Sequence, residues 1–159
     1  MAIPEFILSL REKIGHTELW LPGVTAVVLR ERDGVQETLL VKREDTGAWT
    51  PVTGIIDPGE EPAVAAVREV LEEADVVARA ERLAAVHVID LVRYANGDET
   101  RYLDLVFRCG FVSGTPHPAD GENTEAAWFA LDSLPPMSED MLERIAFAVD
   151  GGEAAHFIN

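Results

Sequence analysis

The sequence predicts an α/β protein, an α/β/α sandwich in which a mixed sheet lies between helices. Three observations predict this fold class: strand-like apolar runs recur along the chain, an Asn-Gly turn joins two of the longest, and helical patterns lie before, among and after them. The 159 residues are expected to form a single domain over residues 1–159. A chain of this length can bury about 68–70% of its unfolded surface.

The N-terminal third is predicted to contribute a helix and a hairpin. Apolar residues at helical spacing predict a short amphipathic helix over residues 4–14. Residues 23–30 form the first predicted strand, and an Asp-Gly turn leads to its partner over residues 37–42. Residues 49–56 then continue as a strand and a loop into an acidic segment.

The acidic segment is predicted to form a helix over residues 62–74. Pro62 suits the first helical turn, where its missing N–H group leaves no bond unmade, and good helix formers follow it. One arc of this helix is apolar and is expected to pack on the sheet. That arc comprises Ala63, Val64, Val67, Val70, Leu71 and Ala74.

The C-terminal half is predicted to hold two long strands, over residues 84–94 and 101–112, joined as an antiparallel hairpin through the Asn-Gly turn. A loop rich in Gly, Pro and Asp follows over residues 113–123 and precedes a short strand over 127–130. A last helix over residues 138–149 closes the fold, with the serine at its start as N-cap and acidic residues in its first turn.

Three glutamates share the face of the predicted central helix that lies opposite its apolar arc. Glu69, Glu72 and Glu73 are expected to converge because i, i+3 and i+4 positions lie on one face. Ala65 and Ala66 lie on the same side and are too small to block access to them. Carboxylates this close repel one another and acquire raised pKa values unless a cation is bound. Oxygen ligands suit Mg2+, with Mn2+ as the alternative, and Mg2+ completes its shell with waters and substrate phosphates.

Taken alone, such a cluster is more often a solvated helix face. The residues upstream favour a metal site instead. Gly54 permits a tight turn, and an Asp-Pro-Gly sequence after it is a strong turn signal. Glu60 lies near the helix entrance, where negative charge is favoured, and Arg68 lies on the same side two turns further on.

These residues resemble the signature of the Nudix hydrolases, the MutT-like superfamily. That signature reads Gly, five residues, Glu, seven residues, then Arg-Glu-apolar-x-Glu-Glu-x-Gly-apolar. It is matched here by Gly54, Glu60, Arg68, Glu69, Val70, Glu72, Glu73 and Val76. Asp75 replaces the second glycine, and Thr53 stands where many members have a glycine before Gly54. Because Asp tolerates a left-handed conformation, a modest stability cost is expected at Asp75 rather than loss of activity.

The resemblance implies the Nudix type of α/β/α sandwich and a Mg2+-dependent hydrolase. Water would attack one phosphorus of the pyrophosphate linkage of a nucleoside diphosphate joined to another moiety. A nucleoside triphosphate, ADP-ribose, a nucleotide sugar and a dinucleoside polyphosphate all remain open as the substrate. The alternative is a noncatalytic nucleotide-ligand sensor on a Nudix scaffold, although such proteins commonly lose carboxylates that are all present here.

The resemblance also implies roles for individual residues of the motif. Glu69 and Glu73 are the expected principal metal ligands, and Glu72 is a third ligand directly or through water. The backbone carbonyl group of Gly54 is a further candidate ligand. Arg68 is expected to orient the glutamates through salt bridges.

The resemblance leaves the general base and the substrate contacts open. Glu122 and Glu125 lie in a segment from which some members bring a further carboxylate, and Glu73 is another candidate for the base. An acidic solvent loop is the competing interpretation of that segment. The candidate substrate-binding residues are Tyr94, Arg43 and Trp49. For the two aromatic residues, packing within the core or a hairpin is the alternative.

Composition supplies the remaining expectations. A formal net charge of −16 with only two lysines disfavours a nucleic-acid polymer as partner, whereas a small nucleotide derivative remains compatible. No apolar run is long enough for a membrane span, and with the single Cys109 this predicts a cytoplasmic protein. Cys109 lies in an apolar run, which favours a buried structural thiol. An isopentenyl-diphosphate isomerase shares the Nudix fold but carries its reactive cysteine ahead of the motif, whereas Cys109 follows it. A homodimer is compatible with the N-terminal helix and Trp20.

Overall fold

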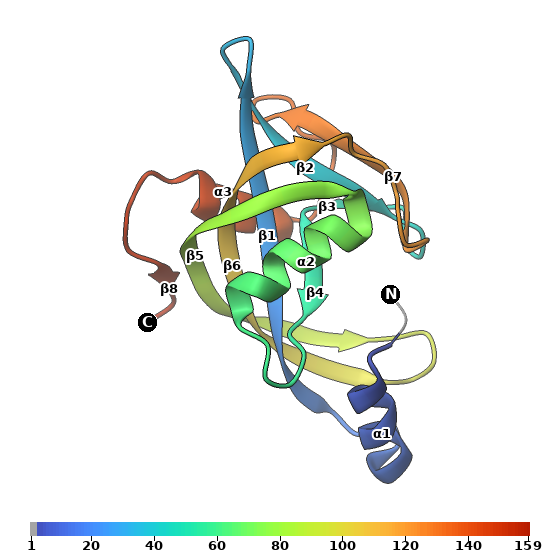
Figure 1. Cartoon of the computed structure of the whole chain (residues 1–159). Coiled ribbons are helices and arrows are strands. Elements are labelled where there is room, and N and C mark those ends of the chain that lie inside the picture. The colour runs from blue at the N-terminus through green and yellow to red at the C-terminus, as the bar shows by residue number, and fades with distance from the viewer. Residues whose placement is uncertain (1–2) are drawn as a thin grey trace.

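The computed structural model describes residues 3–159 and confirms a mixed α/β fold (Figure 1). The elements are α1 (Glu5–Ile14), β1 (Leu19–Arg32), β2 (Val35–Arg43), β3 (Trp49–Thr50), β4 (Val52–Ile55), α2 (Pro62–Ala74), β5 (Val76–Arg93), β6 (Glu99–Gly114), β7 (Asn123–Ala130), α3 (Glu139–Val149) and β8 (His156–Phe157).

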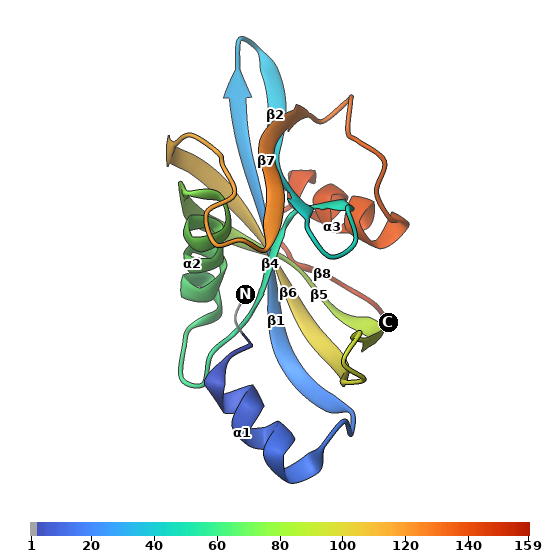
Figure 2. The ribbon, with the colours of Figure 1, turned by 90° about the vertical axis from the view of Figure 1, so that its right-hand side faces the viewer.

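The sheet is mixed because its central pair of strands runs parallel. β1 pairs in parallel with β6, and the antiparallel pairs β1–β2 and β5–β6 extend the sheet to either side. The hydrogen-bonded order is β3-β2-β1-β6-β5-β8, with β4 paired to β1 and β7 paired to β2 off this path. Figure 2 shows α2 and α3 on opposite faces of the sheet and α1 beyond one end of it. This arrangement is the predicted sandwich.

Two apolar clusters, one on each face of the sheet, hold α2 and α3 in place. On β1, Val24 and Val28 belong to the cluster that includes Val70 of α2. Val27, between them, belongs to the cluster that includes Ile145 of α3. Because successive side chains of a strand point to opposite faces, burial of both faces explains why β1 reads as a nearly continuous apolar run.

The helix predictions were accurate, whereas several strands are longer than predicted. α2 has the predicted bounds, and α3 begins after Ser138, whose side chain accepts a hydrogen bond from Met141 N at 3.4 Å. β5 begins at Val76 rather than at residue 84, and β7 begins at Asn123 rather than at residue 127. The start of β5 mixes alanines with charged residues and carries little strand signal, but it pairs with β6 as far as Gly114. The short strand β8 was not predicted.

The buried face of α2 differs from the prediction. Val64 and Leu71 of the predicted apolar arc are 55% and 48% exposed. Val70 and Ala74 of that arc are buried as predicted, and α2 also buries Ala65, Ala66, Glu69 and Glu73. The two alanines are small enough for the helix to approach the sheet closely, and this rotates its buried face toward the glutamates. Two of the three carboxylates consequently lie between the helix and the sheet.

Asp75, which replaces the usual glycine, takes the expected left-handed conformation. Its φ is 51° and its ψ is 37°, and its N–H group donates to Leu71 O at 3.0 Å. Asp75→Gly is expected to raise the free energy of unfolding by up to about 1 kcal/mol, because a Cβ atom is unfavourable in this conformation. Urea denaturation measures this change in the free energy of unfolding. Asp33 also has a left-handed φ, of 53°, so Asp33→Gly should raise the free energy of unfolding by a similar amount. A clear destabilisation by Asp75→Gly would contradict this account of the helix end.

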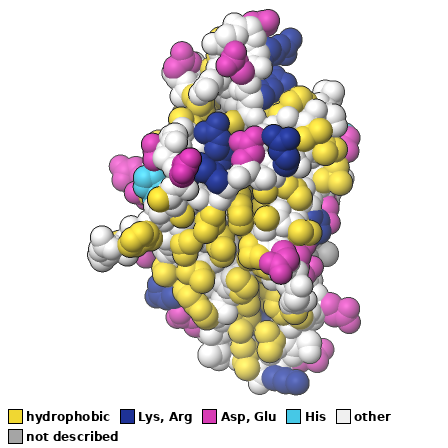
Figure 3. Space-filling view, turned by 60° about the vertical axis from the view of Figure 1, so that its left-hand side comes forward, with side chains coloured by type: hydrophobic (Ala, Val, Ile, Leu, Met, Phe, Trp, Pro, Cys, Tyr) yellow, Lys and Arg dark blue, Asp and Glu magenta, His cyan; other side chains and the backbone are white. Residues whose placement is uncertain are grey.

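An apolar area occupies the middle of the face shown in Figure 3, with arginine and acidic side chains along its upper border. Exposed apolar side chains on α2 and β5 include Val64, Leu71, Val77 and Val88, and Trp20 on β1 is exposed as well. Exposed apolar areas often mark protein contacts, and this one is compatible with the predicted homodimer. The homodimer stays a prediction. Within residues 3–159, no helix combines the length and apolarity that crossing a bilayer requires.

Candidate active site

The candidate active site lies where α2 faces β4 and the start of β7. Glu69 and Glu73 project from successive turns of α2 and are each 3% exposed. Gly54 of β4 leaves the space that Glu69 fills. A Cβ atom added at Gly54 would lie 2.1 Å from Cδ and 2.3 Å from Oε1 of Glu69. The glycine is therefore required at this position because the carboxylate occupies the volume of any larger side chain.

Arg68 connects three of the glutamates in the motif. Its Nε and Nη2 atoms donate to the two carboxylate oxygens of Glu60 at 2.8 and 2.9 Å. Its Nη1 atom donates to Glu69 Oε1 at 2.9 Å and to Glu72 Oε2 at 3.1 Å, and Nη2 also reaches Ile55 O at 3.2 Å. The hydrogen bonds that Arg68 donates to Glu60 raise the pKa of Arg68, and the same contact lowers the pKa of Glu60. This geometry is the one expected of a residue that orients carboxylates.

The two buried carboxyl groups are short of positive charge. Burial raises the pKa of Glu69 to about 7, although the charge and hydrogen bond of Arg68 oppose the shift. Burial likewise raises the pKa of Glu73 to about 7, opposed by a hydrogen bond from Asn123 and increased by the charges of Glu69 and Asp120. The site therefore favours either protonation or a bound cation.

The expected convergence of three carboxylates is not formed. Within residues 3–159, no group of three or more His, Cys, Asp or Glu side chains is placed to hold a metal ion. Glu72 is 53% exposed on the solvent side of α2 and is held by Arg68, because Glu69 and Glu73 turn under the helix instead. Two buried carboxylates nevertheless fit Mg2+, which usually takes one or two protein carboxylates and completes its shell with waters and phosphates.

Gly54 was predicted to offer its backbone carbonyl to the metal. The carbonyl oxygen of Gly54 lies beside β1, 3.4 Å from the position of a Cβ atom built on Gly23. The structure shows that Gly54 leaves space for the Glu69 side chain. Metal binding by the carbonyl group of Gly54 stays a prediction.

Arg43 lies within electrostatic reach of the buried Glu73. A bidentate contact with Asp45, at 2.9 and 2.8 Å, holds the Arg43 guanidinium group. This contact raises the pKa of Arg43, and the charges of Glu73 and Tyr94 add to the effect, so both groups lie within electrostatic reach of Arg43. The hydroxyl group of Tyr94 is hydrogen-bonded to that of Tyr102 at 2.6 Å. Substrate binding by Arg43 or Tyr94 stays a prediction.

Trp49, the third, does not line this site. Its ring packs edge-to-face on Phe129 with a centroid distance of 4.8 Å, within the cluster under α3. The side chains of a strand alternate between faces, and the position of Trp49 directs its ring to the face of the sheet opposite α2. Trp49 therefore packs in the core, which was the alternative to substrate binding.

The segment before β7 supplies two residues that the sequence did not suggest, and a role for Glu122 or Glu125 as general base stays a prediction. Glu125 pairs with Lys42 at 2.8 Å, and the backbone N–H group of Glu122 donates to Asp120 Oδ1 at 3.0 Å. The side chain that reaches Glu73 is Asn123, whose Nδ2 donates to Glu73 Oε2 at 2.9 Å. Asp120 is near enough for its charge to raise the pKa of Glu73. Neither residue belongs to the motif, and no spacing in the sequence indicates them.

Backbone hydrogen bonds hold this segment against the end of α2. The N–H group of Ala119 donates to Glu73 O and that of His117 to Ala74 O, both at 3.2 Å. Because the last turn of a helix leaves its carbonyl groups without partners, these bonds satisfy the helix end. They also place Asp120 next to the buried carboxylates.

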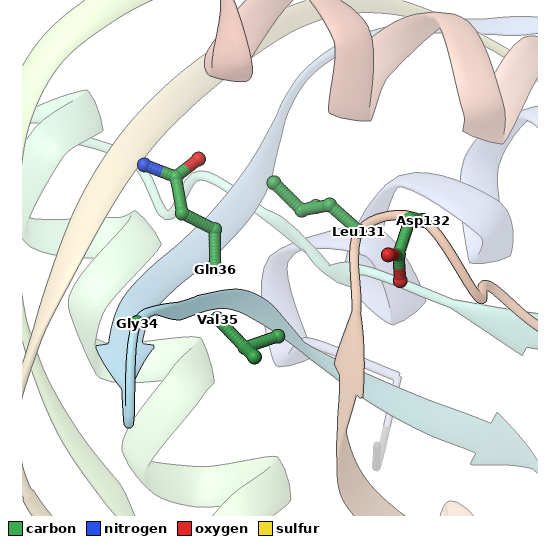
Figure 4. A pocket seen from close by; sticks show the side chains of 5 residues that line it. All are labelled: Gly34, Val35, Gln36, Leu131 and Asp132. Atoms are coloured by element: carbon green, nitrogen blue, oxygen red, sulfur yellow. The ribbon is translucent and has the colours of Figure 1, made fainter.

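Two cavities of the surface lie elsewhere. The one in Figure 4, of about 250 Å3, is lined by Gly34, Val35, Gln36, Leu131 and Asp132, from the β1–β2 turn and the end of β7. A second, of about 480 Å3, is lined by Val86, His87, Val88, Leu103, Phe157 and Ile158. Neither cavity is lined by Glu69, Glu73 or Arg43. The candidate active site is therefore identified by its buried carboxylates and not by either cavity.

The raised pKa values predict how the stability of the metal-free protein depends on pH. Glu69 and Glu73 have a pKa of about 7 when folded and 4.5 in the reference state. Their contribution to stability is thus full below pH 4.5 and is lost as pH rises through about 7, by at most about 3 kcal/mol for each carboxyl. Urea denaturation with EDTA between pH 5 and 8 should show this fall. Mg2+ should restore stability at pH 8, and Glu73→Gln should reduce the slope; equal slopes in the two proteins would contradict the assignment.

Comparison with known proteins identifies relatives over most of the chain. Residues 20–147 match the family model of the NUDIX domain. The human protein 8-oxo-dGDP phosphatase NUDT18 is 35% identical over 112 residues, which cover 70% of this chain and 33% of that protein. A MutT-like protein of Streptomyces ambofaciens is 34% identical over 134 residues, which cover 81% of this chain and 77% of that protein. The chain spans about a third of the length of the human relative.

Solved structures of similar fold include a UDP-X diphosphatase, with a TM-score of 0.68 and 23% identity, covering 98% of this chain and 74% of that one. A MutT NUDIX hydrolase from Burkholderia pseudomallei has a TM-score of 0.58 and 28% identity, covering 82% of this chain and 99% of that one. The family match covers most of the chain, and Gly54, Arg68 and the buried glutamates of the motif occupy one site. The chain therefore belongs to the NUDIX domain family.

Proposed function

We propose that the chain is a Mg2+-dependent hydrolase that cleaves the pyrophosphate linkage of a nucleoside diphosphate joined to another moiety. One observation carries the proposal: Glu69 and Glu73 lie one turn apart on α2 and are each 3% exposed, and burial penalises their ionised forms unless a cation is bound beside them. The names of the relatives support the substrate class, since they include an 8-oxo-dGDP phosphatase and a UDP-X diphosphatase.

Glu69 and Glu73 are the residues that would hold the cation, and Glu72 would contribute through water from the solvent side of α2. When bound, Mg2+ or Mn2+ neutralises the charge of the diphosphate oxygens and makes a bound water more acidic. Arg68 keeps Glu69 oriented through its 2.9 Å hydrogen bond and favours the ionised form of this carboxyl. Gly54 keeps the space that this orientation requires.

The residue proposed to accept a proton from the attacking water is Asp120, with Glu73 and Glu122 as the other candidates. Asp120 acts electrostatically on Glu73, whereas Glu125 is engaged by Lys42. Asp120→Asn is expected to lower kcat by about a hundredfold, the usual size of a general-base contribution, with little change in Mn2+ affinity. Steady-state kinetics and Mn2+ titration measure the two quantities, with Glu125→Gln as the matched control. A comparable loss in both variants would remove Asp120 from this role.

Arg43 and Tyr94 are proposed to contact the substrate. The guanidinium group of Arg43 is held by Asp45 through Nε and Nη2, and a planar cation held in this way suits a phosphate oxygen. Tyr94 is 42% exposed and offers a ring face for a nucleobase. These two residues lie outside the motif, so they are the places where substrate preference would be decided.

Product analysis across a panel of nucleotides tests the proposal. Nucleoside triphosphates and diphosphates, ADP-ribose, nucleotide sugars and dinucleoside polyphosphates are incubated with the protein and Mg2+ or Mn2+, and phosphate and nucleotide products are separated. Metal-dependent cleavage at a diphosphate linkage is the expected result. Binding of a panel member without turnover would favour a noncatalytic sensor instead.

A further inference from the structure

We propose that Asn123 positions Glu73 for cation binding. The inference rests on the proposed function, because it gives a partner to one carboxylate of the proposed metal site. Asn123 is 6% exposed, and its Nδ2 donates to Glu73 Oε2 at 2.9 Å. Among the described residues, no hydrogen bond uses Glu73 Oε1. The contact therefore fixes one oxygen of Glu73 and leaves the other for a ligand.

A bulge in the β2–β7 pair brings Asn123 to this position. Lys42 pairs with Glu125, but the next residue of β2, Arg43, pairs with Asn123, so Thr124 is an extra residue in β7. Further along β7, Ala126 and Trp128 pack in the cluster on the α2 face. Regular alternation would place Thr124 on that face, whereas the bulge places Asn123 there. Bulges commonly redirect a side chain next to an active site.

The amide group suits its place beside a metal carboxylate. A carboxylate only accepts hydrogen bonds, so the amide nitrogen must face Glu73. An amide stabilises the ionised carboxylate without carrying a positive charge that would compete with a cation. The carbonyl oxygen Oδ1 of Asn123 is buried and has no hydrogen-bond donor, an arrangement that costs about 1–3 kcal/mol. The amide is therefore oriented for Glu73 at the expense of its own carbonyl group.

Titration of the metal-free protein with Mn2+, followed by electron paramagnetic resonance, tests the proposal without a substrate. Asn123→Leu is expected to weaken Mn2+ affinity by about 10- to 100-fold, as loss of a partner of a metal ligand usually does. Thr124→Ala is the matched control, because Thr124 is an exposed neighbour in the same strand whose hydroxyl group donates to Lys42 O at 3.4 Å. The Mn2+ affinity of Thr124→Ala should stay within about twofold of that of the wild type. Such a change is much smaller than the change expected when a metal ligand loses its hydrogen-bond partner.

The outcomes separate the two hypotheses. If a folded Asn123→Leu protein binds Mn2+ as tightly as the wild type, the positioning role is overturned and the metal site stands. If the wild-type protein binds no Mn2+, the proposed metal site itself is overturned.

A measurement on the wild-type protein covers the case in which Asn123→Leu does not fold. Side-chain amide signals are followed by 15N NMR during titration with diamagnetic Mg2+. The Asn123 signals are expected to shift with the same midpoint as Mg2+ binding. Asn96 is the internal control, because its Nδ2 also donates to a carboxylate, Asp98 Oδ2 at 3.0 Å, in an exposed turn. Asn123 signals that stay unmoved at saturating Mg2+ would overturn the proposal.

Discussion

Glu73→Gln is expected to lower turnover by about a thousandfold, the size of effect seen when a group that stabilises the charge of a transition state is removed. Glu73 is 3% exposed and carries one of the two buried negative charges of the site. Glutamine keeps the shape of the side chain and removes the charge, so a divalent cation loses a ligand while packing is preserved. Steady-state kinetics with Mg2+ on a cleaved panel member measures the loss in kcat and KM.

Stability distinguishes this loss from damage to the fold. Because the ionised carboxylate is desolvated in the absence of metal, Glu73→Gln should be at least as stable as the wild type at pH 8 with EDTA. Glu61→Gln makes the same chemical change at an exposed residue that precedes α2 and should leave kinetics unchanged. Retained turnover in a folded Glu73→Gln protein would remove Glu73 from the metal site.

Gly54→Ala is expected to reduce turnover by about a hundredfold or more, through Glu69 rather than through the backbone. The φ of Gly54 is not in the left-handed region, so alanine meets no conformational barrier there. The added Cβ atom would lie 2.1 to 2.3 Å from three atoms of the Glu69 side chain, which must leave its place. A misplaced metal ligand of this kind typically costs two orders of magnitude or more.

Mn2+ affinity and kinetics measured together test this explanation. Both should fall in Gly54→Ala, because Glu69 is displaced in the metal-bound and in the metal-free protein. Gly151→Ala is the matched control, since a Cβ atom at Gly151 meets no atom within 4 Å. Unchanged Mn2+ affinity in Gly54→Ala would show that Glu69 finds another productive position or is not a ligand.

The sequence was sufficient for features that depend on neighbours along the chain. The bounds of α2, the left-handed conformation of Asp75 and the cap at Ser138 all follow from local backbone preferences, and the structure confirms them. Helical periodicity also placed Glu69 and Glu73 on one side of α2. It did not determine how far that side turns toward the sheet, because the closeness of approach depends on Ala65 and Ala66 meeting strands that lie elsewhere in the sequence.

Other features of the site depend on contacts between distant segments, and periodicity carries no information about them. Trp49 was assigned to the substrate because aromatic residues bind nucleobases, but strand pairing directs it to the opposite face. Asn123 was predicted to lie in a loop, and only the register between β2 and β7 shows that it faces Glu73. Asp120 is placed by backbone bonds from its own segment to the end of α2.

The sequence by itself determined the family, the central helix and the residues of its motif, because the spacing of glycine, arginine and glutamates is a property of the chain alone. The tertiary structure decided which of these carboxylates are buried and which other residues surround them. The physical reason is desolvation: Glu69 and Glu73 acquire pKa values of about 7 only when the sheet covers α2, and Asn123 reaches Glu73 only when β7 pairs with β2.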